Sequence, residues 1–386
     1  MKTENAKGFK DAENALKKIQ IRNIIEQTFQ LYNFIPVETP IIEYEEFVKG
    51  ENPNDEAVSD IFKLKDKGKR DLALRYEFTF QLKRLAKNKK LPYKRYQIGP
   101  VFRDEPVTGN RWRQFTQCDI DVVGASVKDE AEILRATSDI LKKLKIDFVI
   151  NINNRKLLNE ILEELKISEK NKLQVINEID KLDKLSESEV KRNLKKYGAE
   201  KLLAVFKKPE SYFKKYESYA DVKELKKFCL YYGIKVNFQA FLARGLSYYN
   251  GSIFEIKSKN LKETIIAGGS YMVNNVQATG ISLGLERLEL LANVSMNYKK
   301  VLIISLNQDK IAVGVADSVR ELGIPVQILF GKVGKALEYA NSLDMPLVVF
   351  IGEEEVKKGK VKLKNMNSGK EKFVLMSKLG KELEGL

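Results

Sequence analysis

The chain has 386 residues, of which 43% are hydrophobic and 31% charged, a composition typical of globular proteins with two or three domains. It contains no histidine and only two cysteines, Cys118 and Cys229, which excludes a Ser-His-Asp triad, a His- or Cys-ligated zinc site and a disulfide framework. The formal net charge of +15 favours an anionic partner such as nucleic acid, although a generally lysine-rich proteome would give the same balance.

No run of residues approaches the ~18 consecutive apolar residues that a membrane helix needs. Residues 1–18 are charged and lack an apolar centre, so they predict neither a signal peptide nor a membrane anchor. So few cysteines are typical of a reducing compartment. We therefore expect a cytoplasmic protein without a membrane partner.

Residue periodicity and Pro or Gly boundaries predict the elements of the first half of the chain. In chain order these are a helix over 10–33, an extended stretch over 36–42, strands over 93–105 and 111–124, a helix over 128–143 and a strand over 147–151. Turn-forming residues at 106–110 predict a loop between the two long strands.

Residues 154–232 are dominated by Lys, Glu and Leu at helical spacing, which predicts a helical insertion. Within 181–208, nine Lys or Arg residues outnumber four Asp or Glu residues. This excess indicates either a contact with RNA or a solvated helical face.

Strand patterns resume after the insertion, and a strand–helix alternation fills the last part of the chain. Before the last part, the predicted elements are strands over 234–240, 252–258 and 262–267, a helix over 281–293 and a polar joint over 297–300. After the joint, strands over 301–306, 326–330 and 346–351 alternate with helices over 309–322 and 333–343. Strands over 360–365 and 372–376 and a closing helix complete the chain. The alternation predicts a separate C-terminal α/β domain.

The predicted strand 111–124 places unusual residues on one face, because alternate side chains point the same way. That face collects Arg111, Arg113, Phe115, Gln117, Asp119 and Asp121, and the other face holds Trp112, Gln114, Thr116, Cys118, Ile120 and Val122. Charged groups backed by an apolar face need partners, which a ligand can supply. The alternative is an exposed sheet face with cross-strand ion pairs.

The segment Phe102-Arg-Asp-Glu105, followed by a short loop and Arg111-Trp-Arg-Gln-Phe115, resembles motif 2 of the class II aminoacyl-tRNA synthetases. Thr39-Pro40 resembles motif 1, and Gly280-Ile-Ser-Leu-Gly-Leu-Glu-Arg287 resembles motif 3. The three segments stand in the order that this class has.

Within that class the chain resembles the histidyl-tRNA synthetase family almost from end to end. Arg244-Gly-Leu-Ser-Tyr-Tyr249 and Ala267-Gly-Gly-Ser-Tyr271 are similar to its two signature segments, and Gly8-Phe-Lys-Asp11 to its opening. The segments 75–79 and 117–121 resemble the archaeal and eukaryotic branch.

The resemblance implies an α+β fold in three parts. We expect a class II catalytic domain, with an antiparallel sheet flanked by helices, over 1–153 and 233–297. The helical insertion over 154–232 interrupts it, and an anticodon-binding α/β domain follows over 298–386.

It also implies a histidine–tRNA ligase that activates histidine with ATP and transfers it to tRNA(His). Mg²⁺ would bridge phosphate oxygens, with no metal site built from the protein alone. A homodimer is expected because motif 1 forms the dimer interface of this class.

For ATP, the resemblance implies arginines, which are always charged and pair with phosphate oxygens through two N–H groups. Arg103 and Arg244 would flank the α-phosphate as the catalytic residues. Arg111 and Arg287 would lie along the β- and γ-phosphates, and Phe115 would stack on adenine. Glu105 and Arg113 complete the implied ATP site.

For histidine, it implies a pocket that pairs both ring nitrogens and thereby rejects analogues. Asp121 and Tyr249 would bind the ring. Glu77, Thr79 and Gln117 would hold the α-ammonium group, with Tyr271 closing the pocket and Arg244 and Tyr248 beside the amino acid. The alternative for Tyr249 and Tyr271 is a purely structural place in the core.

Three positions depart from the family pattern: Ser247, Ser270 and Met272. One rival interpretation is therefore an inactive paralogue with a regulatory or RNA-binding role, although the chain keeps Arg103, Arg244 and residues 301–386. Another is a class II synthetase for threonine, proline or glycine, against which the 244–249 segment argues.

Overall fold

The computed structural model describes residues 3–13, 15–50, 59–109, 111–183, 185–244, 248–294 and 300–385, without the side chains of residues 183 and 262. The chain forms two compact units, residues 1–294 and 295–386, and each is described by itself. None of the helices in the described ranges is both long and apolar enough to span a membrane.

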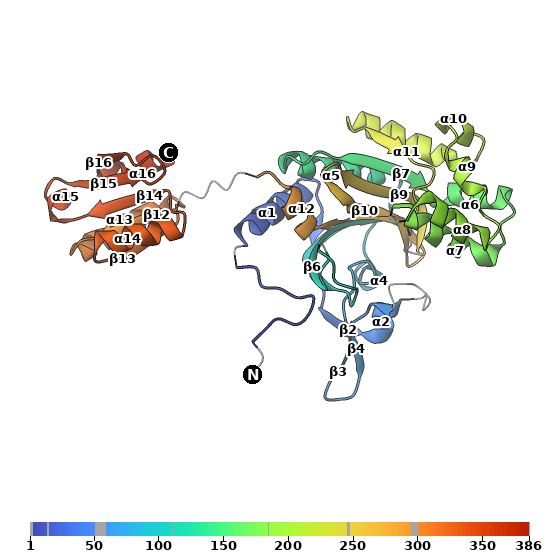
Figure 1. The fold of residues 1–386 in the computed structure, drawn as a ribbon, viewed down its shortest axis with the longest axis horizontal. Helices are drawn as coiled ribbons and strands as arrows, with labels where there is room; N and C mark the ends of the chain where they lie inside the picture. Colours follow the sequence, from blue (N-terminus) through green and yellow to red (C-terminus); the bar gives the residue numbers. More distant parts are fainter. Residues whose placement is uncertain are drawn as a thin grey trace. The chain divides into compact units, whose positions relative to one another are not determined.

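An eight-stranded sheet forms the centre of the first unit (Figure 1). Its strands, in spatial order, are β1 (Ile35–Pro36), β5 (Tyr93–Phe102), β6 (Gln114–Val123), β11 (Val276–Gly284), β10 (Leu261–Val273), β9 (Tyr249–Ser258), β7 (Val149–Asn154) and β8 (Val236–Phe238). All neighbours pair antiparallel except β1 with β5 and β7 with β8, which are parallel. The expected antiparallel sheet is confirmed.

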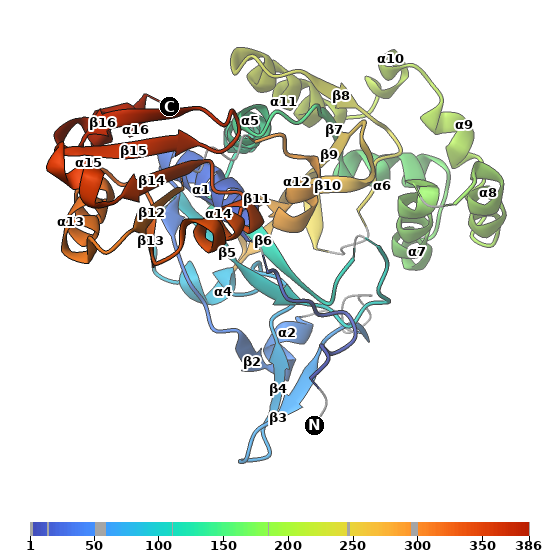
Figure 2. The same ribbon diagram turned by 60° about the vertical axis from the view of Figure 1, so that its left-hand side comes forward.

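One face of this sheet is apolar and lies under helices. Alternate residues of β6, namely Cys118, Ile120 and Val122, join the main hydrophobic core, as do residues of α1 (Leu16–Leu31), α5 (Val127–Lys143) and α12 (Leu285–Leu291). In Figures 1 and 2 these helices lie on one side of the sheet, and a small sheet lies on the other. The face that carries Gln117, Asp119 and Asp121 is therefore turned away from the helices.

The small sheet was not predicted as a sheet. Its strands are β2 (Ile42–Tyr44), β4 (Asp71–Leu74) and β3 (Lys63–Lys65), accompanied by α2 (Glu45–Lys49) and α4 (Leu82–Leu85). Strands of three or four residues are too short to show a reliable alternation.

The predicted helical character of 154–232 is confirmed. The helices are α6 (Arg155–Glu164), α7 (Glu169–Asp180), η1 (Lys181–Asp183), α8 (Glu187–Lys195), α9 (Leu202–Phe206), α10 (Glu210–Phe213) and α11 (Tyr219–Tyr231). Figures 1 and 2 show α7, α8 and α9 together beyond one end of the large sheet. Apolar residues of these helices belong to the same hydrophobic core as the sheet.

The second unit has the predicted strand–helix alternation. Its elements are β12 (Val301–Ser305), α13 (Asp309–Glu321), β13 (Val326–Phe330), α14 (Val333–Ser342), β14 (Leu347–Ile351), α15 (Glu353–Lys357), β15 (Lys360–Asn365), β16 (Glu371–Leu375), η2 (Met376–Lys378) and α16 (Leu379–Glu384). The sheet order is β13-β12-β14-β15-β16, with β12 parallel to both neighbours. Val301 and Ile303 enter one core and Leu302 and Ile304 another, so both faces of β12 are covered.

Several predicted boundaries were wrong, among them that of the strand 262–267, which runs on to Val273. The first helix begins at Leu16 rather than at residue 10, and β6 begins at Gln114 rather than at residue 111. The predicted helix 281–293 is a strand up to Gly284, because Ile281 and Leu283 enter the core while Ser282 and Gly284 face the opposite side. This period of two matches the pairing of β11 with β6 and β10 on its two edges. The polar joint lies mostly outside the described residues.

Candidate active site

A cavity of about 890 Å³ opens on the polar face of the large sheet. Residues of β6, β9, β10 and β11 line it together with the loop before β6. The predicted site residues among its lining are Glu77, Thr79, Arg103, Glu105, Arg111, Phe115, Gln117, Asp121, Arg244, Tyr248, Tyr249, Tyr271 and Arg287. Segments far apart in the sequence thus meet at one cavity.

The cavity exists because the strand in the middle of its floor carries small side chains. Gly280, Ser282 and Gly284 of β11 all line it, while the intervening Leu283 is buried in the core. In the register of the sheet, Gly280 lies opposite Asp121 and Ser282 opposite Asp119. The carboxylate of Asp121 therefore lies in the space that a side chain at residue 280 would fill.

Four arginines share this cavity. Arg287, at the start of α12, donates from Nη1 to the carbonyl of Thr264 at 2.6 Å. Burial lowers the pKa of Arg287, and repulsion from Arg111, Arg103 and Arg244 lowers it further. Because the cations disfavour one another, an anionic ligand placed among them is stabilised.

Arg103 follows directly after β5 and lies between two aromatic rings. Its guanidinium carbon is 4.2 Å from the ring centre of Tyr76 and 5.1 Å from that of Phe115. Its Nη2 donates to Oε1 of Gln117 at 3.2 Å. These contacts orient a planar cation over the cavity.

Arg111 and Arg113 precede β6, and only one of them lines the cavity. Arg111 lies 3.3 Å from Oε2 of Glu105. Arg113 is absent from the described lining and instead pairs with Asp104 at 2.8 Å, packing against Gly8. The structure therefore does not bring Arg113 to the cavity with the other predicted ATP-binding residues, and its role in the ATP site stays a prediction. Trp112, expected on the other face, lines the cavity, because the strand alternation begins only at Gln114.

Arg244 is held by a residue that the sequence did not indicate. Its Nη1 lies 3.5 Å from Oε1 of Glu255, a buried carboxylate of β9. The hydroxyl of Thr264 donates to the same oxygen. The sequence does place the carboxylate of Glu255 between Phe254 and Ile256 in a predicted strand. Because a buried charge needs a partner, this position could have indicated a partner for a site arginine.

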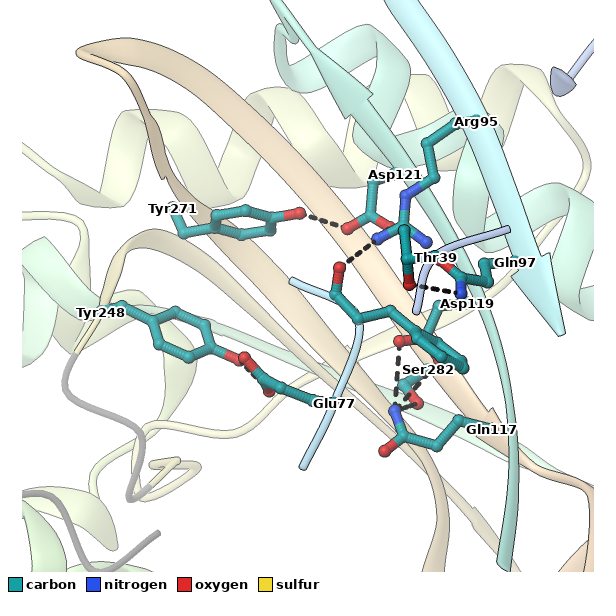
Figure 3. Close-up of polar contacts among 11 residues, drawn as sticks. Thr39, Glu77, Arg95, Gln97, Gln117, Asp119, Asp121, Tyr248, Tyr271 and Ser282 are labelled. Carbon is teal, nitrogen blue, oxygen red and sulfur yellow. Dashed lines mark hydrogen bonds and ion pairs between the residues drawn. The ribbon is translucent and has the colours of Figure 1, made fainter. Parts of the chain in front are cut away.

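Carboxylates and phenols line the same cavity, and Figure 3 shows the polar contacts of several of them. The hydroxyl of Tyr271 donates to Oδ1 of Asp121, and the hydroxyl of Tyr248 to Oε2 of Glu77 at 3.3 Å. Nε2 of Gln117 donates to Asp119 at 3.1 Å and to the hydroxyl of Ser282 at 2.8 Å. Asp119 thus lies between predicted site residues, although it was not predicted as one of them.

Burial changes the proton affinity of these acids. It raises the pKa of Glu77 to about 7. Burial, together with the charge of Asp121, raises that of Asp119 to about 7 as well. Among the described residues, Oε1 of Glu77 is buried without a hydrogen-bond partner. A cationic group that entered here would offset the burial of these carboxylates.

Two of the three departures from the family pattern, Ser270 and Met272, do not line the described cavity. Ser270 is buried and donates a hydrogen bond to Glu130, and the side chain of Met272 is exposed. Ser247 lies outside the described residues. The inferred phosphate and ring ligands are therefore unaffected by Ser270 and Met272.

Comparison with known proteins agrees with this geometry. A model of the family described as histidyl-tRNA synthetase matches residues 9–288, and one of an anticodon binding domain matches residues 300–386. Histidine–tRNA ligase 1 of Bacillus cereus is 32% identical, over 99% of this chain and 100% of its own length. Histidine–tRNA ligase 2 of Shouchella clausii is 33% identical, over 97% of this chain and 98% of its own.

The structural comparison leads to the same family. The crystal structure of histidyl-tRNA synthetase from Nostoc sp. PCC 7120 has a TM-score of 0.86 and 25% sequence identity, covering 100% of this chain and 99% of that one. The relatives named here are bacterial, so the expected archaeal and eukaryotic branch is not supported. With a match over residues 9–288 and relatives that align end to end, the chain belongs to the histidyl-tRNA synthetase family.

Proposed function

We propose that the chain is an ATP-dependent histidine–tRNA ligase. The observation that carries the proposal is the cavity itself, which brings Arg103, Arg111, Arg244 and Arg287 together with several carboxylates and phenols. The near-complete alignment with histidine–tRNA ligases supports it. An inactive paralogue is not favoured, because these four arginines line one cavity.

In the first step, a carboxylate oxygen of histidine attacks the α-phosphorus of ATP. The bond from that phosphorus to the bridging oxygen of the β-phosphate breaks, and diphosphate leaves with the electron pair. Negative charge grows on the α-phosphate oxygens, so fixed cations are the main catalytic requirement. Arg103 and Arg244 supply them there, and Arg111 and Arg287 neutralise the departing diphosphate.

The same cavity orients both substrates. Phe115 stacks on adenine beside Arg103. Glu77 binds the α-ammonium group of histidine with its unpartnered Oε1, assisted by Thr79 and by the carbonyl oxygen of Gln117. Asp121 accepts the ring N–H, and the hydroxyl of Tyr249 donates to the other ring nitrogen.

ATP enters as its magnesium complex. Among the described residues no cluster of three or more Cys, Asp or Glu side chains could hold a metal ion. Mg²⁺ is commonly held by substrate phosphates with one or two carboxylates. Glu255 and Glu263 line the cavity beside the arginines and fit that role. The ion adds positive charge to the phosphates.

In the second step, a ribose hydroxyl of the terminal adenosine of tRNA(His) attacks the carbonyl of the adenylate and AMP leaves. Because the chain lacks histidine, a phosphate oxygen or a carboxylate accepts the proton. The loop at 106–110 meets the acceptor end, and the C-terminal unit reads unstacked anticodon bases. A cytoplasmic location stays a prediction.

We further propose a homodimer that forms through the edge of the large sheet at β1. Ile35 of this edge strand is 54% exposed, and Tyr44 nearby in the chain is 58% exposed. Apolar side chains exposed along a sheet edge are typical of an interaction surface. Sedimentation of the purified chain tests the dimer.

ATP–pyrophosphate exchange with each amino acid in turn tests the ligase. We expect histidine-specific exchange, and a loss on the order of 10²–10³-fold for Arg103→Ala and for Arg244→Ala. Arg135→Ala is the control, because Arg135 pairs with Asp139 on α5 at 2.9 Å and does not line the described cavity. Exchange with another amino acid would contradict the specificity, and no exchange with any would favour the inactive paralogue.

A further inference from the structure

Arg95 is a fully buried cation directly behind the histidine pocket. It lies on β5 with an exposed fraction of 0%, and its Nη2 is 2.7 Å from Oδ2 of Asp121. We propose that Arg95 is a positioning residue for histidine, which keeps Asp121 an oriented carboxylate that only a ring N–H can satisfy. The inference rests on the proposed function, because it assigns the ring to Asp121.

The sheet register creates this pair. Arg95 lies directly opposite Asp121 on the neighbouring strand β6, so both side chains leave the same face. The same Nη2 donates to the carbonyl of Phe78 at 2.9 Å, and Phe78 stands between Glu77 and Thr79. One guanidinium therefore connects the ring-binding carboxylate with the segment proposed to hold the α-ammonium group (Figure 3).

Three neighbours restrict the carboxylate of Asp121. Arg95 lies at Oδ2, the hydroxyl of Tyr271 donates to Oδ1, and Gly280 lies against Oδ1 from β11. A β-carbon at Gly280 would be only 2.1 Å from that oxygen. The carboxylate is thus held from three strands and has little freedom to rotate.

Arg95 also sets the charge of this carboxylate. Burial raises the pKa of Asp121, and the guanidinium of Arg95 is the strongest influence that lowers it. Among the other titratable groups around it, the carboxyl group of Asp119 disfavours a charge on Asp121, and the phenol of Tyr249 supplies none. The hydroxyl of Tyr271 lowers the pKa of Asp121 through its hydrogen bond, but less than Arg95 does. Without Arg95, the balance shifts towards the protonated form of Asp121.

The charge decides which rings the pocket accepts. An ionised carboxylate only accepts hydrogen bonds, whereas a protonated one can also donate. Neutral imidazole offers an N–H and satisfies the carboxylate. The thiazole ring of 2-thiazolylalanine has no N–H, so it cannot donate a hydrogen bond to the carboxylate, which only accepts. The pocket therefore rejects this ring as long as Asp121 is ionised.

Arg95→Gln in the full chain tests the proposal, by histidine- and thiazolylalanine-dependent pyrophosphate exchange between pH 6 and 9. We expect kcat/KM for histidine to fall about 10- to 100-fold at pH 7 while KM for ATP stays unchanged. The preference for histidine over thiazolylalanine should shrink by at least about tenfold. Both losses should diminish as rising pH ionises Asp121.

Two further variants distinguish a role of Arg95 in positioning Asp121 from a role in folding. Arg95→Lys keeps the cation and should keep the preference within about threefold of wild type, with a raised KM for histidine alone. Arg75→Gln is the matched control, because Arg75 is also buried but donates to the carbonyls of Thr39 and Pro100, both at 2.7 Å. The Arg75→Gln variant should have a lower melting temperature but the same preference for histidine over thiazolylalanine as the wild type.

A folded Arg95→Gln variant with wild-type preference and pH profile would overturn the inference while leaving the ligase proposal intact. If only Arg95→Lys folds, a retained preference with a raised KM for histidine supports the inference, and a lost preference overturns it. Wild-type protein without histidine-dependent exchange would refute the proposed function, and the inference with it.

Discussion

Replacement of Gly280 by alanine is expected to damage histidine binding selectively. The new β-carbon would stand 2.1 Å from Oδ1 and 2.8 Å from Cγ of Asp121, whereas ordinary contact begins at 3.4 Å. Asp121 cannot move aside freely, because Arg95 and Tyr271 hold it. On the other side, the carbonyl oxygen of Ile120 is only 3.0 Å from the new atom.

Overpacking of this kind costs about 1–3 kcal/mol. If the whole cost falls on the pocket, it corresponds to about 5- to 150-fold in the binding of histidine. KM for ATP should change little, because the atoms nearest to the added β-carbon belong to Asp121 and Ile120 and not to an arginine. Pyrophosphate exchange with each substrate varied in turn measures both constants.

Gly284→Ala is the matched control for this substitution. Gly284 lines the same cavity on the same strand, but its added β-carbon would meet only Arg287, at 3.8 Å or more. We expect near-normal constants for it. A Gly280→Ala protein with an unchanged KM for histidine, or with equal losses for both substrates, would refute the steric argument.

Three further predictions follow from the site and its surroundings. Because burial raises the pKa of Glu77 to about 7, protonation should weaken histidine binding about tenfold between pH 8 and pH 6. Glu77→Gln, titrated calorimetrically over the same range, should show a smaller slope, which leaves the titrations of Asp119 and of histidine itself. Phe115→Ala should raise KM for ATP by about 5- to 150-fold through lost stacking worth about 1–3 kcal/mol, and an equal rise for histidine would contradict the adenine assignment. Burial also raises the pKa of Glu130 from 4.5 to about 7, so the folded state binds the proton more tightly than the unfolded state. The free energy of unfolding should therefore fall as pH rises through that window and level off above it, and urea titrations of Glu130→Gln should show a smaller fall.

The local chemistry of the motifs predicted much of the site. Arg103, Arg111, Arg244 and Arg287 were expected from four separate segments, and all line one cavity. Arg113 was expected beside them but does not line the described cavity, because the start of strand β6 is decided by tertiary pairing as well as by local pattern. The loop at residue 8 and the ion pair with Asp104 hold Arg113 away from the lining.

Residues that act through others were harder to predict. Glu255, Asp119 and Arg95 stand in predicted strands without a recognisable motif. Their importance comes from the strand that lies beside them, and neighbours in a sheet are not neighbours in the chain. The misassigned helix at 281–284 has the same origin, since Ile281 and Leu283 form a short apolar pattern that suits either element.

The sequence by itself determined the family, the α/β alternation of residues 301–351 and many of the side chains that line the cavity, because motif chemistry and periodicity are properties of short segments. Only the tertiary structure decided that Gly280 and Arg95 flank Asp121 and that Glu255 holds Arg244. The physical reason is that sheet register brings distant strands into contact, and both the charge of a buried carboxylate and the space around it depend on those contacts.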